Sequence, residues 1–211
     1  MPKRVDHSAK RMEILEAARR TVAGRGLEGA TVRAISKEAG YSTGVLTRYF
    51  KNKEDVIEGA TEAAFRREVA EMRSAARGLH GLEALRAIHH SDQPVTDEHR
   101  GDSRTWLRFV VEGMVHERLA QRFRDHYRYW RRVTRKELLA GIAAGEFAAD
   151  IDVALEVDRL IALSDGLLIQ VLFEPKRWPV SRFRAAIDAQ LAAIPPPATH
   201  PRTHAPERAE R

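Results

Sequence analysis

Apolar residues recur at spacings of three and four from about residue 9 to residue 194, and alternating strand patterns are nearly absent. A first apolar stripe in residues 14–22 predicts a helix that ends near residues 24–26, where glycines cluster. A second, short stripe in residues 32–39 stops at a glycine. The pattern therefore predicts an all-α protein that begins with one longer and one short helix.

Later stripes predict about seven more helices. These are expected near residues 43–50, 53–77, just after Gly81, and then at 106–114, 119–138, 153–173 and 183–194. Residues 89–103 contain a proline and a glycine and are expected to form a loop. The whole chain should thus form about nine helices.

Residues 32–50 have the spacing of a helix-turn-helix motif, with Gly40 between two short apolar stripes. Glycine adopts a left-handed turn conformation at little cost, so the two helices can cross at a steep angle. Thr31, Ser42 and Asn52 stand where helices should begin, and their side-chain oxygens can accept the unpaired N–H groups of a first turn. The second helix of the motif would be a recognition helix for DNA.

Gly44 lies inside that helix, where glycine costs roughly 1 kcal/mol relative to alanine. Without a Cβ, the start of the helix can approach a phosphate backbone closely. Lys53 follows in the first turn of the next helix, where a cation beside free N–H groups can bind phosphate. The other polar groups available to DNA would be Arg33, Ser42, Thr43, Thr47 and Arg48.

The net charge of +6 is unevenly distributed. Residues 1–58 hold 12 Lys and Arg against 8 Asp and Glu, as expected for a polyanion-binding module joined to a nearly neutral domain. The chain has no cysteine, which excludes disulfides and thiolate metal sites. No apolar signal segment follows the N-terminus, and charged residues interrupt the apolar stretch 153–173, so we expect a cytoplasmic protein with no membrane span.

A series of short motifs runs through residues 9–60. They are the link at Gly26, Thr31-Val32-Arg33, Ile35, Glu38-Ala39-Gly40, Ser42, Gly44, Tyr49-Phe50 and Lys53-Glu54. Together they resemble the DNA-binding domain of TetR-family transcriptional regulators. The resemblance extends over most of the chain, and the C-terminal half resembles the subgroup around the choline-responsive repressor.

The resemblance implies contacts with DNA at individual positions. Family members contact phosphates or the DNA backbone from the positions that hold Thr31, Tyr49 and Lys53 in this sequence. They contact bases, or use recognition-helix residues, at the positions that hold Arg33, Thr43, Thr47 and Arg48. Two positions depart from the family pattern, because most members have tyrosine in place of Thr47 and an aromatic residue in place of Val22. Thr47 reaches less far than tyrosine, so this contact differs from that of the family.

The family also has an effector pocket in its C-terminal domain, which the resemblance places between two consecutive helices. Its candidate lining residues, each of which could instead be ordinary core, are Trp106, Phe109, Val110, Met114, His126, Tyr127 and Trp130. Aromatic walls with a few polar groups suit a small apolar or cationic molecule. Charged neighbours such as Arg108 are expected at the surface.

The helix at 153–173 is apolar around most of its circumference, so it either lies at the centre of its domain or meets a partner chain. With the helix at 180–194, the resemblance implies a homodimer with two-fold symmetry. We assign residues 1–54 to the N-terminal arm and DNA-binding domain and residues 55–194 to an effector-binding and dimerisation domain. Residues 195–211 are proline-rich and are expected to be disordered.

These features favour a ligand-responsive transcriptional regulator, a repressor that binds a pseudo-palindromic operator as a dimer and is released by a small-molecule effector. The alternatives are an architectural DNA-binding protein without an effector and an all-helical enzyme that uses the C-terminal cavity. No acid–base or metal constellation supports the enzyme, so we expect no cofactor and no metal. A group of histidines in a loop-rich stretch is expected to be solvated rather than metal-binding: His80, His89, His90 and His99.

Overall fold

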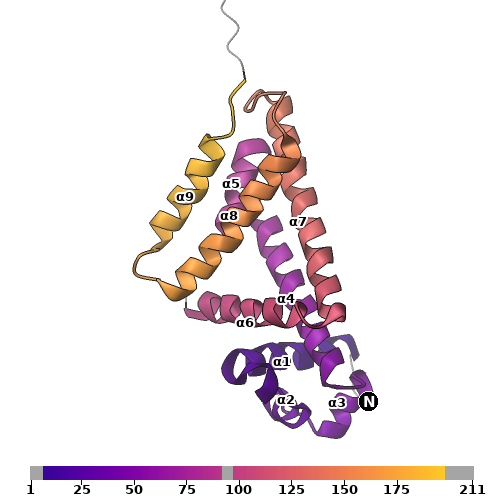
Figure 1. Ribbon diagram of the computed structural model, residues 1–211. Helices are drawn as coiled ribbons and strands as arrows, with labels where there is room; N and C mark the ends of the chain where they lie inside the picture. The colour runs from indigo at the N-terminus through magenta and orange to yellow at the C-terminus, as the bar shows by residue number, and fades with distance from the viewer. Residues whose placement is uncertain (1–6, 92–96, 198–211) are drawn as a thin grey trace, which may run out of the picture.

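The computed structural model describes residues 7–91 and 97–197. Within these ranges the chain forms nine helices and no strand, which confirms the predicted all-α fold (Figure 1). Most of the proline-rich tail predicted at 195–211 lies outside the described residues.

Three helices make up a small N-terminal group, and six make up a larger body. The small group consists of α1 (His7–Gly29), α2 (Val32–Ala39) and α3 (Thr43–Tyr49). The body consists of α4 (Lys53–Ala75), α5 (Gly81–Ser91), α6 (Asp97–Gly113), α7 (Glu117–Ala143), α8 (Val153–Phe173) and α9 (Val180–Ala192). Because α4 begins beside α3 and continues far into the body, the domain boundary predicted after residue 54 falls within its first turn.

The three predicted N-caps are present. Thr31 Oγ1 accepts a hydrogen bond from the N–H of residue 34 at 3.1 Å, and Ser42 Oγ accepts one from the N–H of residue 45 at 3.4 Å. Asn52 Oδ1 accepts one from the N–H of Asp55 at 2.8 Å. Gly40 has φ 71°, so α2 ends in the left-handed conformation that glycine enters easily. Local sequence signals therefore set the helix-turn-helix geometry.

Two predicted boundaries differ from the structure. The first helix does not stop at residues 24–26 but continues to Gly29, with a kink where Gly26 takes φ 72° and ψ 175°. The loop predicted at 89–103 is wrong at both ends, because α5 continues to Ser91 and α6 begins at Asp97, and residues 92–96 lie outside the described residues. A helix accommodates a glycine at a cost of only about 1 kcal/mol, so Gly101 was a weak reason to predict a loop.

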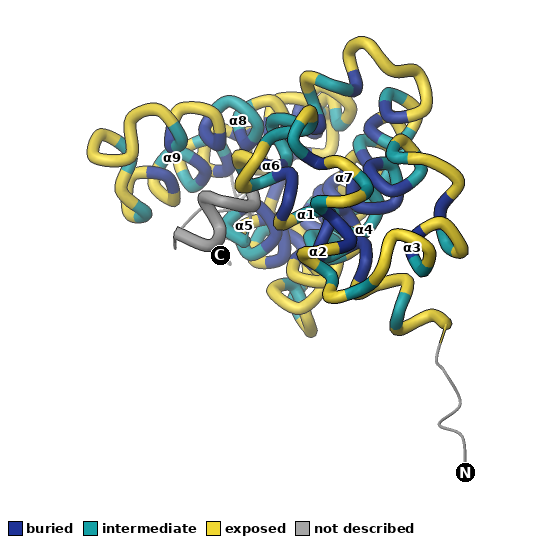
Figure 2. Tube along the Cα trace, turned by 90° about the horizontal axis from the view of Figure 1, so that it is seen from below, coloured by how far each residue is buried: buried dark blue, intermediate teal, exposed yellow. Residues whose placement is uncertain are grey.

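The helix α6 lies crosswise between the small group and the body, as Figure 1 shows. From this level α4 and α7 rise together, and α8 and α9 run next to each other on the other side of the body. Seen from below in Figure 2, exposed residues cover much of α2 and α3, whereas dark-blue buried residues lie along α1 and α4. The small group thus presents α2 and α3 outward, and its helix α1 packs against α4 and α6 of the body.

Buried apolar side chains form a core that continues from the small group into the body. Ile14, Ile35 and Leu46, from α1, α2 and α3, are at most 1 % exposed. They belong to the same buried cluster as Phe109 of α6 and Phe123 of α7. A continuous core of this kind resists hinge opening between the two parts, because separation would expose apolar surface to water.

His89 corrects the prediction that the clustered histidines are solvated. Its side chain is fully buried between α5 and α8, where Nδ1 lies 2.9 Å from Ser164 Oγ and the ring meets Trp130 edge-on at 5.8 Å. Burial, with a smaller contribution from the neighbouring His90, lowers the pKa of His89 to about 4. The ring is therefore a neutral core residue at physiological pH.

This burial should make folding stability depend on pH. The folded protein keeps His89 neutral down to about pH 4, whereas the unfolded chain protonates this ring near its ordinary pKa of about 6.5. Stability is therefore fully present above about pH 6.5 and is lost as the pH falls toward 4. We expect the free energy of unfolding in urea to fall by about 2 kcal/mol between about pH 7.5 and about pH 5 because of this residue.

The variant His89→Asn should lose this part of the pH dependence, whatever its absolute stability. An unchanged pH dependence in His89→Asn would contradict the assignment.

Candidate functional site

The exposed face of α3 carries the predicted recognition residues. Leu46 is 1 % exposed and anchors the helix in the core, whereas Thr43, Gly44, Thr47 and Arg48 are exposed. Because α3 is only two turns long, one buried side chain is enough to fix which face points outward. The structure therefore brings the predicted α3 residues together on one outward surface.

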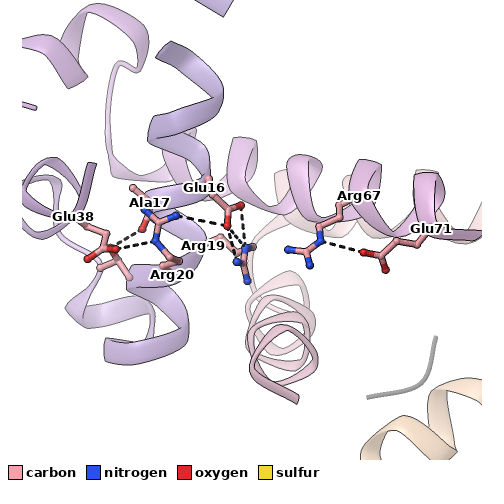
Figure 3. Close-up of polar contacts among 8 residues, drawn as sticks. Glu16, Ala17, Arg19, Arg20, Glu38, Arg67 and Glu71 are labelled. Atoms are coloured by element: carbon pink, nitrogen blue, oxygen red, sulfur yellow. Dashed lines mark hydrogen bonds and ion pairs between the residues drawn. The ribbon is translucent and has the colours of Figure 1, made fainter. Parts of the chain in front are cut away.

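Three of the cations predicted to contact DNA have no counter-charge in the described part of the chain. Within residues 7–91 and 97–197, no ion pair involves Arg33 of α2, Arg48 of α3 or Lys53 at the start of α4. By contrast, Arg19 and Arg20 of α1 both form ion pairs in the row shown in Figure 3. Cations without ion-pair partners attract a polyanion and can replace its counterions.

Gly44 has no structural role inside the chain. A Cβ placed on it would meet only Ser42 Oγ, at 3.9 Å, and its backbone is helical. The N-terminal turn of α3 is capped by the Ser42 side chain and otherwise open. A glycine that neither turn geometry nor internal contacts require is consistent with close approach of an external surface.

The two remaining α3 positions of interest are held by contacts within the chain. Thr47 Oγ1 donates to the Gly44 carbonyl at 3.2 Å, so its hydroxyl is turned back onto its own helix. Tyr49 is half-buried, and its hydroxyl lies 3.0 Å from Nδ1 of His7 at the start of α1. The tyrosine hydroxyl is thus positioned by α1, whereas Thr47 presents mainly its methyl group outward.

The base of α4, beside Lys53, is fixed to α7 by charge pairs. Arg118 Nη1 lies 3.0 Å from Asp55 Oδ1 and Arg122 Nη2 lies 2.8 Å from Glu58 Oε1, and Arg118 also pairs closely with Glu58. The hydrogen bond from Arg118, which outweighs the opposing effect of burial, holds the pKa of Asp55 below its usual value. These pairs connect the first turns of α4 to the first turns of α7.

A cavity of about 110 Å³ lies inside the body, where α1, α4, α6, α7 and α8 converge. Four of the predicted ligand residues line it, namely Trp106, His126, Tyr127 and Trp130. Three do not: Phe109 is 1 % exposed core, Val110 packs against the core, and Met114 lies beyond the end of α6 with its side chain 77 % exposed. The helical stripe that suggested all seven residues does not separate core positions from cavity positions.

Carboxylates and aromatic rings meet at one end of this cavity. Tyr127 donates to Asp165 Oδ2 at 2.7 Å, and His126 Nε2 lies 3.3 Å from Glu68 Oε1. Burial, together with the nearby Glu68 charge, raises the pKa of Asp165. Burial and the Asp165 carboxylate likewise raise the pKa of Tyr127. Two neighbouring acids against Trp106 and Tyr127 form a site that favours a cation.

The indole of Trp130 adds a further polar feature. The side chain is only 3 % exposed, and its Nε1 is buried with no hydrogen-bond partner in the described part of the chain. Such unpaired buried donors are uncommon. An oxygen atom of a bound molecule could accept this hydrogen bond.

Sequence reasoning missed the charged residues of the cavity. They are Arg19 on α1, Arg67, Glu68 and Glu71 on α4, and Asp165 on α8. The sequence did hold a partial signal for the last of these, because Asp165 is the only charged residue in 160–173. The other four lie on amphipathic helices, where a charge ordinarily indicates a solvated face.

Arg108 links the cavity helix α6 to α1, although it was predicted to lie at the surface. Its Nη1 donates to the Val22 carbonyl at 2.5 Å and to the Ala23 carbonyl at 2.7 Å. These carbonyls would normally accept from residues 26 and 27, but the kink at Gly26 interrupts the helix there. The guanidinium therefore caps α1 from another helix and connects the small group to the cavity wall.

Among the described residues no helix is long and apolar enough to cross a membrane. The same residues contain no cluster of three or more side chains suited to holding a metal ion.

Comparisons with known proteins agree with this geometry. Residues 14–60 match the family described as bacterial regulatory proteins, tetR family, and residues 81–196 match the family described as BetI-type transcriptional repressor, C-terminal. The chain is 28% identical over 196 residues to the HTH-type transcriptional regulator PksA of Bacillus subtilis, covering 92% of this chain and 94% of that protein. It is also 28% identical over 195 residues to the HTH-type transcriptional regulator BetI of Escherichia coli K12, covering 88% and 92%.

A solved structure shares the fold. The structure of a transcriptional regulator from Saccharomonospora viridis in complex with choline superposes with a TM-score of 0.80 at 24% identity, covering 89% of this chain and 97% of that one. The matched families are transcriptional regulators, which excludes the enzyme considered from the sequence. The helix-turn-helix, the cavity above it and the two family matches together show that this chain belongs to the TetR family of transcriptional regulators, with a C-terminal region of the BetI repressor type.

Proposed function

We propose that this regulator binds a pseudo-palindromic operator as a homodimer through α3 and leaves the DNA when a small organic cation enters the cavity. The observation that carries the proposal is that two features occur in one molecule and are joined by a continuous core. The first is the set of predicted DNA-contacting cations without ion-pair partners, and the second is the aromatic, acidic cavity. An architectural DNA-binding protein would need the first feature but not the second.

On the DNA side, the proposed contacts fall into two groups. Thr31, Tyr49 and Lys53 lie at helix ends or beside capped N-termini, where side chains and N–H groups suit phosphates. Thr43, Thr47 and Arg48, with Ser42 and Gly44 at the start of α3 and Arg33 on α2, would face the major groove. Two such faces reach successive grooves if they lie about 34–36 Å apart, so a dimer can recognise two half-sites.

On the ligand side, Trp106 and Tyr127 provide aromatic faces, and Glu68 and Asp165 provide negative charge. A quaternary ammonium is stabilised by both, because aromatic rings have a negative face and the carboxylates compensate its charge. Choline, the ligand of the Saccharomonospora structure, is a molecule of this type. We therefore take choline as the reference effector for experiments.

Two connections would carry ligand binding to DNA binding. Arg108 ties α6, which lines the cavity with Trp106, to α1 of the DNA-binding group. The helix α4 lines the cavity with Glu68 and begins at Lys53 on the DNA face. A ligand that binds more tightly to one placement of α4 and α6 favours the spacing of the two recognition helices that goes with it. The free-energy difference between the two states changes by the ligand's difference in binding free energy for them.

The dimer interface would form on α8 and α9. Ala162, Gly166, Ile169 and Phe173 follow one another at spacings of three and four on the outer face of α8, and Phe173 is 76 % exposed. A Cβ on Gly166 would meet nothing within 4 Å, so this face is open in the single chain. Small residues between larger apolar ones allow two helices to approach closely, as a four-helix interface requires.

The first prediction tests DNA recognition. In mobility shifts on the DNA flanking its own gene, the protein should form a sequence-specific complex at moderate salt. Arg48→Ala should weaken this complex by about tenfold or more while random DNA is little affected, because Arg48 would read bases. Lys53→Ala should weaken all DNA alike and reduce the slope against log salt by about 1, because it would contact a phosphate. Absence of any specific complex would refute the proposed function.

A second prediction concerns Gly44. Gly44→Ala should raise the free energy of unfolding by about 0.5–1 kcal/mol, because alanine is the better helix former and the site has room for a Cβ. The same change should weaken operator binding by about tenfold, since the methyl group would stand between α3 and the phosphate backbone. Urea denaturation and mobility shifts measure the two effects.

Gly24→Ala is the control for that change, because Gly24 is an exposed glycine of α1 where an added Cβ would likewise meet nothing within 4 Å. It should stabilise the fold without affecting DNA binding. Undiminished operator affinity in Gly44→Ala would show that the glycine is not needed for close approach.

A third prediction addresses the interface. Ile169→Asp should convert the dimer to a monomer in sedimentation velocity, because a buried unpaired carboxylate costs several kcal/mol, of the order of a dimer's stability. Val115→Asp, at a residue that is 73 % exposed in the turn between α6 and α7, should leave the dimer intact. A dimer that persists in Ile169→Asp would place the interface elsewhere.

A further inference from the structure

The cavity has a second charged end besides the one formed by Glu68 and Asp165. Arg19 of α1 and Arg67 of α4 both line it, and the Arg19 side chain is only 12% exposed. Figure 3 shows the two arginines beside each other, Arg19 paired with Glu16 at 2.6 Å and Arg67 paired with Glu71 at 3.1 Å. The cavity wall therefore holds two guanidinium groups, with Glu71 paired to one of them, and a separate pair of carboxylates, Glu68 and Asp165, near aromatic rings.

We infer that the effector is a zwitterion whose cationic group lies against the aromatic, acidic end and whose anionic group is bound by Arg19 and Arg67. This inference rests on the proposed function and narrows the class of its effector. A guanidinium has five N–H donors in a planar fork, a geometry that suits the oxygens of an anionic ligand group. Two arginines that converge on one point suit a carboxylate or a phosphate.

The size and the separation of the two ends fit a small molecule. The cavity volume of about 110 Å³ is of the order of the roughly 150 Å³ known to hold a benzene molecule, so the site suits only a small ligand. Arg67 and Glu68 are consecutive residues of α4, so the two ends lie only a few ångströms apart. A quaternary ammonium separated from a carboxylate by one or two carbons matches this arrangement, whereas choline would use only one end.

Arg19 also connects the ligand to the DNA-binding group without an intermediate helix. It lies on α1, and its partner Glu16 is 3.7 Å from Arg20, which in turn pairs with Glu38 of α2 at 2.8 Å. This row of ion pairs, drawn in Figure 3, leads from the cavity to the helix that precedes the recognition helix. A ligand anion that competes with Glu16 for Arg19 would alter the row at its first member.

The charges around Glu16 agree with this path. Burial alone would raise the pKa of Glu16, but the hydrogen bond from Arg19 and the charges of Arg19, Arg20 and Arg67 outweigh it and hold that pKa below its usual value. Arg67 is thus close enough to Glu16 to affect its ionisation. The two arginines and Glu16 form one electrostatic unit in which an added anion changes every pair.

The test compares two ligands that share a trimethylammonium group. Trimethylglycine carries a carboxylate and choline a hydroxyl, and their dissociation constants are measured by calorimetry on the full-length protein without DNA. We expect trimethylglycine to bind the wild type about tenfold more tightly or better, as a charge-assisted pair of hydrogen bonds allows. Operator release in mobility shifts should follow the same order.

Arg19→Gln should remove this preference by weakening trimethylglycine about tenfold while choline is unchanged, and Arg67→Gln should act in the same direction. Arg66→Gln is the matched control, because Arg66 precedes Arg67 on α4, is 67 % exposed and does not line the cavity. Its ratio of the two dissociation constants should equal that of the wild type. A thermal melt establishes that each variant is folded. Because Arg19→Gln and Arg67→Gln are separate variants, the test can still be made with one of them if the other does not fold.

Three results would overturn the inference. These are equal or tighter binding of choline by the wild type, equal weakening of both ligands by Arg19→Gln and Arg67→Gln, or no binding of either ligand. In each of these cases the protein would still form a specific complex with its operator. Failure of the proposed function is distinguishable, because no specific DNA complex would then form.

Discussion

The capping of α1 by Arg108 is the contact on which the two halves of the molecule depend. The chain breaks the helix at Gly26 and thereby frees the carbonyls of Val22 and Ala23, and a guanidinium from α6 satisfies them. Buried carbonyls without a partner are costly, so separating α6 from α1 is opposed by more than the loss of apolar contact. The DNA-binding group is consequently oriented by the helix that lines the ligand cavity.

The cavity itself is a compromise between stability and response. Its charged side chains lie on several helices, and some of them form ion pairs, such as Arg67 with Glu71 and Arg19 with Glu16. The Arg19 side chain is 12 % exposed, so its pair with Glu16 is costlier to break than the exposed pair of Arg67 with Glu71. A ligand with charges of its own can replace some of these pairings and favour a different arrangement of the same helices.

Much of the fold followed from local signals in the sequence. The bounds of α8, the glycine turn at Gly40 and the cap at Asn52 were all predicted, because each depends on residues within a few positions of one another. His89 and Arg19 were not, since their surroundings are provided by Ser164 and Arg67, distant residues of other helices. Periodicity identifies the inward face of a helix, but it does not tell whether that face meets core or cavity.

The length of α4 has a mechanical consequence. Twenty-three residues at 1.5 Å each make a rod of about 34 Å, with Glu68 roughly 22 Å from Lys53 along the axis. A tilt of about 5° around the cavity would move the Lys53 end by about 2 Å, enough to lengthen a phosphate contact beyond hydrogen-bonding range. The helix therefore acts as a lever, and its stiffness should set how much of a small adjustment around the ligand arrives at the DNA.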